Sequence, residues 1–190
     1  MSNFVLGLDV STSVTGICVI DSDIAPDDNG SHIVYLDRID FKKCKTLWQK
    51  ADVVFKELSS LWPTKGFKIS KFALEEPLLG FSKGMSSAAT ITTLMRFNGI
   101  VSYIGRNSFG IDPMYISAAA ARKLCGVKLV KRALGGPQKE QVFKHMSEHD
   151  LKHIQWPKKK SGADADWSRD ATDAYVIARA ASLMHKQEDE

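Results

Sequence analysis

The sequence predicts an α/β protein whose mixed β-sheet is covered by helices on both faces. Residues 4–41 form three apolar runs joined by short polar turns, which is typical of an antiparallel meander. Later strand-like runs alternate with stretches of helical period, which favours added parallel strands. The 190 residues, 44% of them apolar, suffice for one domain with a sizeable core. We therefore expect a single domain over residues 1–190, with a charged tail at about residues 186–190.

The first half of the chain begins with an expected hairpin from Phe4 to Asp21, in which two apolar runs flank a small polar turn. A turn rich in Asp, Asn, Gly and Pro separates it from a third strand, His32 to Phe41. Apolar residues then recur at a helical period from Leu47 to Trp62, and Pro63 ends this helix. Lys71 to Glu75 reads as a short strand that closes on carboxylates.

The second half begins with residues 78–87, which are rich in glycine and serine and predict a mobile loop. A long helix is expected from Ala88 to Ile104, followed by a short strand from Pro113 to Ile116. Ser117 caps the next helix, which Gly126 ends. Two further helices are expected over residues 137–151, begun by a proline, and over residues 168–186.

Composition narrows the classes of function. The net charge of +4 is mildly basic, which permits a polyanionic partner. Cys18, Cys44 and Cys125 are widely spaced without a Cys-x-x-Cys pair, so neither a disulfide framework nor a zinc site is indicated. The N-terminus enters a strand at once, without the pattern of a signal peptide, transit peptide or membrane span. We expect a protein of the bacterial or phage-infected cytoplasm that is not secreted and has no membrane partner.

One carboxylate, Asp9, stands inside the first apolar strand. An ionised carboxylate among apolar side chains is costly unless it is paired or binds a metal. Gly7 and Gly16 carry no side chain, so a backbone or a ligand can approach closely. Asp9 is either a strand-end residue that caps the turn at residues 11–13 or a metal ligand on a central strand.

Two further acidic sites come from distant segments. Asp170 and Asp173 are three residues apart, so both project from one side of the first turn of the last helix, where simple capping is an alternative. The alanine-rich face of this helix predicts close packing on the sheet, which presents Asp9 and Glu75. Glu76 follows Glu75, and because neighbouring strand residues point to opposite faces, only one of the two can join Asp9.

Clustered carboxylates of this kind suit two-metal phosphoryl transfer. Mg²⁺ and Mn²⁺ prefer oxygen ligands, and two ions about 3.5–4 Å apart stabilise the attacking and leaving oxygens of an in-line displacement. Without metal the carboxylates would repel one another and titrate as a coupled group, which disfavours a purely structural cluster. We therefore predict two Mg²⁺ or Mn²⁺ ions per site, held by Asp9, Glu75, Asp170 and Asp173.

Four stretches, GLDVSTSVTG, ALEEP, GGPQKEQV and RDATDAYVIA, together resemble the motifs of RuvC-type Holliday junction resolvases, nucleases of the RNase H-like superfamily. The resemblance runs from Phe4 to about Ala181. It implies an RNase H-like fold and an endonuclease that resolves four-way DNA junctions by paired symmetric nicks. It also implies cleavage that leaves a 5′-phosphate and a 3′-hydroxyl, and a homodimer with two sites.

Carried over by position, Asp9, Glu75, Asp170 and Asp173 match the family's metal ligands. Lys139 falls in a segment where the family keeps a lysine near the scissile phosphate. The residues agree with that role, because Lys139 lies in the first turn of an expected helix, where a phosphate is favoured. A solvated surface lysine is the alternative.

Three segments are candidate DNA contacts. The family often places an aromatic wedge after its glutamate, and this loop offers Leu78 and Phe81, with Lys83 close by. The connection Val127 to Gly136 is basic and is either an additional DNA contact or a solvated loop. A third segment, flanked by Trp156 and Trp167, suits backbone contact and base stacking, or is a disordered charged loop. The basic candidates in these last two segments are Lys128, Lys131, Arg132, Lys158, Lys159 and Lys160.

The helix from Ala88 to Ile104 is the expected dimer interface. The resemblance suggests it, and the apolar residues of this helix cover more than one of its faces. These residues are Ile91, Leu94, Met95, Ile100, Val101 and Ile104.

Two other functions stay open. The opening strand also resembles the phosphate-1 motif of sugar kinases and actin-like ATPases, but 190 residues hold neither a duplicated domain nor a second phosphate loop. A junction-binding module without catalysis is the other alternative, and the complete set of acids disfavours it.

Overall fold

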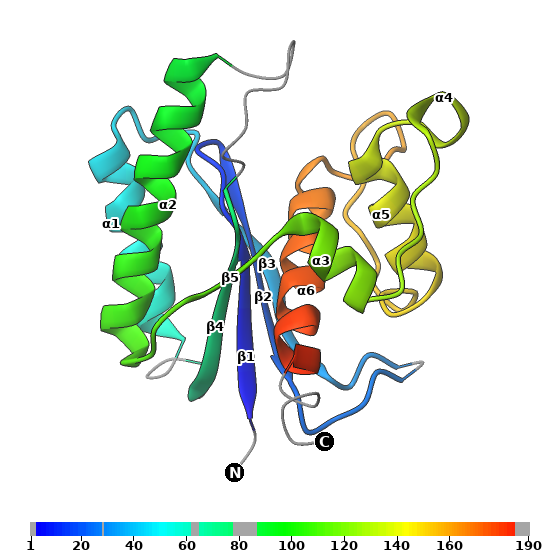
Figure 1. Ribbon diagram of the computed structural model, residues 1–190, viewed down its shortest axis with the longest axis horizontal. Helices are drawn as coiled ribbons and strands as arrows, with labels where there is room; N and C mark the ends of the chain where they lie inside the picture. The colour runs from blue at the N-terminus through cyan, green and yellow to red at the C-terminus, as the bar shows by residue number, and fades with distance from the viewer. Residues whose placement is uncertain (1–2, 28, 62–64, 78–86, 185–190) are drawn as a thin grey trace.

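The computed structural model describes residues 3–27, 29–61, 65–77 and 87–184, and they build one five-stranded sheet between two helical layers (Figure 1). The strand order is β3-β2-β1-β4-β5. The strands are β1 (Phe4–Asp9), β2 (Val14–Asp21), β3 (Ile33–Asp40), β4 (Ile69–Glu75) and β5 (Met114–Ile116).

The sheet is mixed in the way that the sequence predicts. Strands β1, β2 and β3 pair antiparallel, while β4 pairs parallel to β1 and β5 pairs parallel to β4. The carboxyl ends of β1 and β4 therefore meet at the same edge of the sheet. This edge is where Asp9 and Glu75 end their strands.

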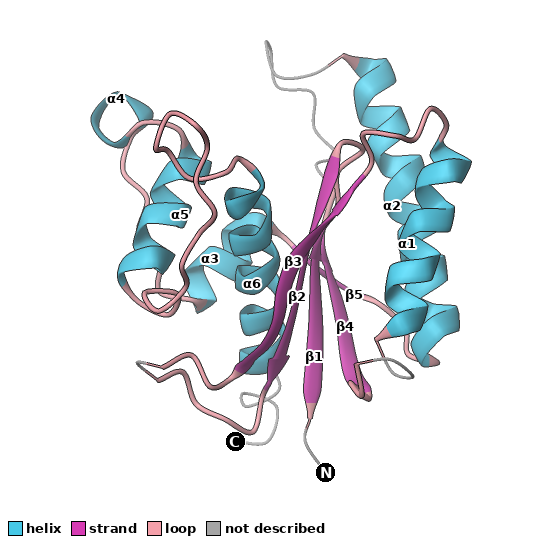
Figure 2. Ribbon diagram, turned by 180° about the vertical axis from the view of Figure 1, so that it is seen from behind, coloured by secondary structure: helices cyan, strands magenta, loops and turns pink. Residues whose placement is uncertain are grey.

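Helices cover both faces of the sheet, as predicted. Two helices, α1 (Leu47–Ser60) and α2 (Ala88–Phe109), lie on one face. On the other face Figure 2 shows α3 (Ala118–Leu124), α5 (Gln138–Glu148) and α6 (Trp167–Met184), with the short α4 (Arg132–Gly135) at the outer end of this layer. Within the described residues, we find no helix that combines the length and the apolarity needed to span a membrane.

Two helix ends predicted from the sequence are wrong, and one short helix was not predicted. Helix α2 continues past Ile104 to Phe109. Gly105 does not end the helix, because it packs inside it against the Phe72 ring. The helix is capped instead by Gly110, which has a φ of 69°. Helix α5 ends at Glu148, where the chain turns, and not near Leu151. The short helix α4 lies within the basic connection Val127 to Gly136, for which the sequence predicts no helix.

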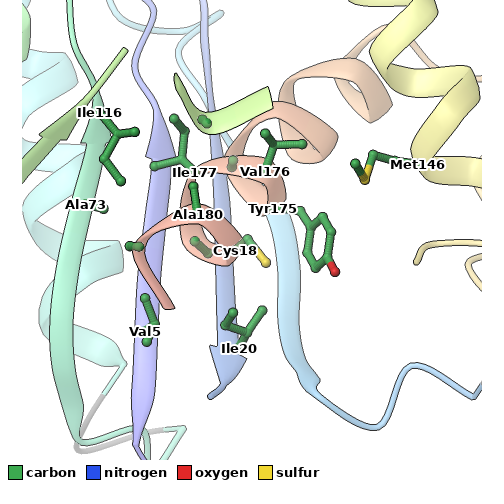
Figure 3. Packing of buried hydrophobic residues seen from close by; sticks show 14 of the residues in the cluster. Val5, Cys18, Ile20, Ala73, Ile116, Met146, Tyr175, Val176, Ile177 and Ala180 are labelled. Atoms are coloured by element: carbon green, nitrogen blue, oxygen red, sulfur yellow. The ribbon is translucent and has the colours of Figure 1, made fainter. Parts of the chain in front are cut away.

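The core has two parts, one on each face of the sheet. Successive side chains of β1 alternate between them, with Val5 in one part and Leu6 and Leu8 in the other. The part beneath α6 includes Tyr175 and many small side chains (Figure 3). Asp9 follows the alternation of Val5 and Gly7, so it belongs to the α6 side.

Helix α6 lies almost in backbone contact with the two central strands. A Cβ atom on Gly7 would lie 2.4 Å from the backbone oxygen of Ala174, and one on Gly16 would lie 1.9 Å from that of Asp170. Neither distance is possible for a real side chain, so any larger residue at either position would force the strand and the helix apart. The close packing predicted from the alanine-rich face is present, and it brings the acidic first turn of α6 onto the strand ends.

Candidate functional site

Asp9 ends β1 with its side chain turned to the α6 layer. The alternative role, capping of the following turn, is filled by other residues: the Ser11 hydroxyl accepts hydrogen bonds from the backbone N–H groups of Ser13 and Val14, and the Thr15 hydroxyl donates to the Ser11 carbonyl. The Asp9 carboxylate instead accepts a hydrogen bond of 3.3 Å from the Lys139 ammonium. Its side chain is only 14% exposed.

The Lys139 ammonium lies among three carboxylates from two elements. Its Nζ is 2.6 Å from Asp170, 3.2 Å from Asp173 and 3.3 Å from Asp9. Lys139 comes from the first turn of α5, while Asp170 and Asp173 come from the first turns of α6. The structure thus brings together four of the five residues that the sequence predicts for catalysis.

Glu75, the fifth residue, ends β4 beside β1. Its carboxyl is partly buried and within the electrostatic reach of Asp9 and Asp173, and burial together with these two acids raises its pKa to about 7. The neighbouring Glu76 is exposed. The buried amide of Asn98 on α2 donates to the Glu75 backbone oxygen at 3.3 Å and so fixes the end of β4. Of the two glutamates, Glu75 is therefore the one that faces the other acids.

Burial and mutual repulsion keep these acids from ionising easily. Burial and the Asp9 carboxylate raise the pKa of Asp173 to about 7. Burial also raises the pKa of Asp9, while Lys139 opposes the rise. Burial on its own would lower the pKa of Lys139, but the carboxylates outweigh it and raise that pKa above its usual value. The site is therefore a partly desolvated cluster of acids, and the Lys139 ammonium in its midst favours their ionised forms.

Arg122 on α3 is a charged neighbour that the sequence analysis missed. Its guanidinium lowers the pKa of Asp9, Glu75 and Asp173 through charge attraction. It also donates a hydrogen bond of 3.4 Å to Gln138, the residue before Lys139. No local pattern identifies Arg122, because its position depends on how α3 packs against α6.

A bidentate ion pair fixes α5 against α6 beside the site. Arg169 donates to both carboxylate oxygens of Glu140 at 2.9 Å, and its guanidinium stacks on the Phe143 ring at 4.3 Å. These partners are direct sequence neighbours of Asp170 and Lys139, respectively. The pair therefore sets the distance between the two functional helices.

The donor set fits a hard divalent cation, since it consists of carboxylate oxygens only. Among the residues described by the structure, three or more acidic, histidine or cysteine side chains do not meet in a ready-made metal geometry. The acids surround the Lys139 ammonium instead, so Lys139 has to give way for a cation to be shared by them.

The candidate DNA contacts have different surroundings. Leu78, Phe81 and Lys83 lie outside the described residues. Lys128, Lys131 and Arg132 are exposed around α4. In the loop before α6, Lys158 and Lys159 pair with Asp164 and Asp166, and Lys160 is exposed.

The two tryptophans that flank this last loop are packed within the protein. Trp156 contacts Phe143 and Trp167, and the guanidinium of Arg38 lies 4.3 Å from the Trp167 ring centre. The loop is therefore folded and not disordered.

The sequence matches no protein-family model and no curated protein. The structure, however, is similar along nearly its whole length to solved structures of RuvC and of a Holliday junction resolvase. It superposes on Thermus thermophilus RuvC in complex with a Holliday junction substrate with a TM-score of 0.66 and 12% identity, covering 97% of this chain and 96% of that one. A second Thermus thermophilus RuvC structure gives a TM-score of 0.60 and 14% identity, and it also covers 97% of this chain and 96% of that one.

The yeast mitochondrial Holliday junction resolvase Ydc2 is also similar, with a TM-score of 0.55 and 13% identity over 99% of this chain and 83% of that one. At these identities the likeness concerns the fold. The chain therefore has the RuvC-like, RNase H-like fold of the Holliday junction resolvases.

Proposed function

We propose that this protein is a divalent-metal-dependent endonuclease that cleaves phosphodiesters in branched DNA and resolves four-way junctions by paired symmetric nicks. One observation carries the proposal: Asp9, Asp170 and Asp173, from distant parts of the sequence, converge on Lys139 at one end of a RuvC-like sheet. A structural role alone does not explain three partly buried acids around one cation, because neutral packing would cost less.

In this proposal Asp9, Glu75, Asp170 and Asp173 hold two Mg²⁺ or Mn²⁺ ions. Bound there, such ions would supply activation of water and neutralisation of charge at the phosphate. Lys139 then turns from the acids to the non-bridging oxygens of the scissile phosphate, aided by the first-turn N–H groups of α5. Arg122 lowers the proton affinity of three of the acids, which keeps them available as ligands.

Two such sites in a homodimer would nick opposite strands. On α2, the expected interface, Val101 is buried in the core and Ile104 packs against it, while Met95 and Tyr103 are 42% and 64% exposed. We propose that this exposed side of α2 forms the dimer contact. Sedimentation at micromolar concentration tests this, since a monomer under these conditions contradicts the dimer.

Cleavage of a labelled synthetic four-way junction in Mg²⁺, beside a three-way branch and a linear duplex, tests the proposed activity. We expect paired symmetric nicks on the junction with 5′-phosphate ends, and no nicks with the Asp9→Asn protein. Equal cutting of all branched substrates would replace a resolvase with a general debranching nuclease. Junction binding in EDTA without nicking in Mg²⁺ or Mn²⁺ would favour the non-catalytic binding module.

A further inference from the structure

The connection between α3 and α5 is an ordered projection with an unusual surface. Val127 is buried and Leu129 packs against the core, whereas the alternate residues Lys128 and Val130 face solvent. Helix α4 follows at the outer end of this layer (Figure 1). We call residues 127–136 the basic protrusion.

The basic protrusion is held in one shape by a single side chain of α5. The Gln141 amide accepts a hydrogen bond from the Val130 N–H at 2.9 Å and donates to the Val130 and Gly136 carbonyls at 3.1 and 3.0 Å. Gly135 lies so close that an added Cβ would be 2.5 Å from the Val130 side chain. The backbone of the protrusion is therefore held against α5 on both sides of α4.

The tip of the protrusion exposes apolar side chains. Leu134 on α4 is 83% exposed, more than any other large apolar side chain among the described residues, and Val130 is 54% exposed. An uncovered leucine forgoes the gain of burial, which suggests that a partner covers it. Because the backbone around Leu134 is already ordered, binding of a partner there would cost little additional conformational entropy.

The charges around the tip identify the partner as a polyanion. Lys128, Lys131 and Arg132 are exposed, and residues 127–136 contain no acid. A groove of about 500 Å³, lined by Lys128, Arg122, Lys123 and Gln138, runs from the protrusion to the residue before Lys139. A strand that occupies the candidate active site can thus continue along this groove to the protrusion.

We propose that the basic protrusion is a second DNA-contacting element that reads the branch point, a proposal that rests on the proposed function. Leu134 packs against bases that are unstacked at the branch, and Lys131 and Arg132 contact the adjoining phosphates. A continuous duplex keeps its bases stacked and offers no apolar face to Leu134. The protrusion therefore favours branched over linear DNA.

Fluorescence of 2-aminopurine tests this when the base analogue replaces a base at the branch point of a four-way junction. Binding is measured in EDTA, so that nothing is cleaved. We expect wild-type protein to increase the fluorescence and Leu134→Ser to remove most of the increase and weaken junction binding about tenfold, with linear duplex binding unchanged. Leu134→Met should retain both signals, and Ile24→Ser, at an exposed residue between β2 and β3, is the matched control.

The phosphate contacts are tested with the same junction at several salt concentrations. Lys131→Ala should weaken binding to junction and duplex alike and reduce the dependence of affinity on salt by about one charge. A Leu134→Ser protein that equals wild type in fluorescence and junction affinity would overturn the branch-point proposal and leave the nuclease proposal standing. A wild-type protein that neither binds nor cleaves the junction would instead overturn the proposed function, and the protrusion's role with it.

Discussion

Substitution of Gly16 by alanine tests whether the contact between β2 and α6 positions the acids. Gly16 pairs with Asp9 across the sheet and lies under the backbone of Asp170. The new Cβ would lie 1.9 Å from the Asp170 oxygen, where an ordinary contact needs about 3.4 Å, so strand and helix must separate by about 1.5 Å. Backbone is on both sides, so no side chain can swing away to absorb the overlap.

The separation acts on stability and on activity to different extents. Overpacking of a well-packed contact costs about 1–3 kcal/mol of unfolding free energy. A displacement of a catalytic group by about 1 Å costs roughly 10²-fold in rate. We therefore expect Gly16→Ala to remain folded at 25 °C and to cleave a four-way junction about 100-fold more slowly.

Gly99→Ala is the matched control. Gly99 lies in α2, is exposed, and has nothing within 4 Å of an added Cβ. The same change there should stabilise the helix by about 0.5–1 kcal/mol, and because Gly99 lies between Met95 and Tyr103 on the proposed dimer side of α2, it is a control for stability only. Chemical unfolding and single-turnover cleavage measure the two effects. A Gly16→Ala protein with wild-type cleavage would refute the claim that this contact positions Asp170.

Three further predictions concern the charges of the site. Burial and the Asp9 carboxylate raise the pKa of Asp173 from 3.8 to about 7. Without metal, ionisation of Asp173 therefore lowers the free energy of unfolding progressively as the pH rises from about 4 to 7. Asp173→Asn should raise the free energy of unfolding by about 2 kcal/mol at pH 8 in EDTA and should not change it at pH 4. Lys139→Met should slow cleavage at least about 10²-fold and lower metal-free stability at pH 8, because three acids lose their counter-charge. Arg169→Ala should cost about 1 kcal/mol and reduce cleavage, because α5 and α6 lose their clamp.

Denaturant unfolding in EDTA at several pH values and cleavage assays in Mg²⁺ measure these effects. A stability difference between Asp173→Asn and wild type that does not depend on pH would contradict the raised pKa. Undiminished cleavage by Lys139→Met would remove Lys139 from the phosphate. Arg169→Lys serves as the conservative control for the clamp, and cleavage by Arg169→Ala equal to wild type would show that the clamp is dispensable.

The sheet could be predicted because its signals are local. Alternating apolar runs, turn residues and the isolated acid in the first strand lie within a few residues of one another. The small residues of α6 also predicted its close approach to the sheet, and the two glycines of the central strands show how that approach is achieved. The convergence of Asp9, Asp170 and Asp173 follows from this packing.

Other features depend on tertiary contacts that the sequence does not display. Arg122 reaches the acids only because α3 packs on α6, and the continuation of α2 through Gly105 depends on the Phe72 ring. Lys158 and Lys159 find acidic partners through the fold of their own loop. The catalytic, metal and DNA-binding roles of the predicted residues stay predictions that the proposed experiments test.

Cleavage by Glu75→Gln and Glu76→Gln in Mg²⁺, beside wild type, tests the central claim most directly. The two substitutions are chemically identical and adjacent, but Glu75 faces Asp9 and Asp173 while Glu76 is exposed. If the carboxylates form a metal-dependent nuclease site, Glu75→Gln abolishes junction cleavage and Glu76→Gln leaves it intact. Wild-type cleavage by Glu75→Gln, or equal loss in both variants, would contradict this account of the site.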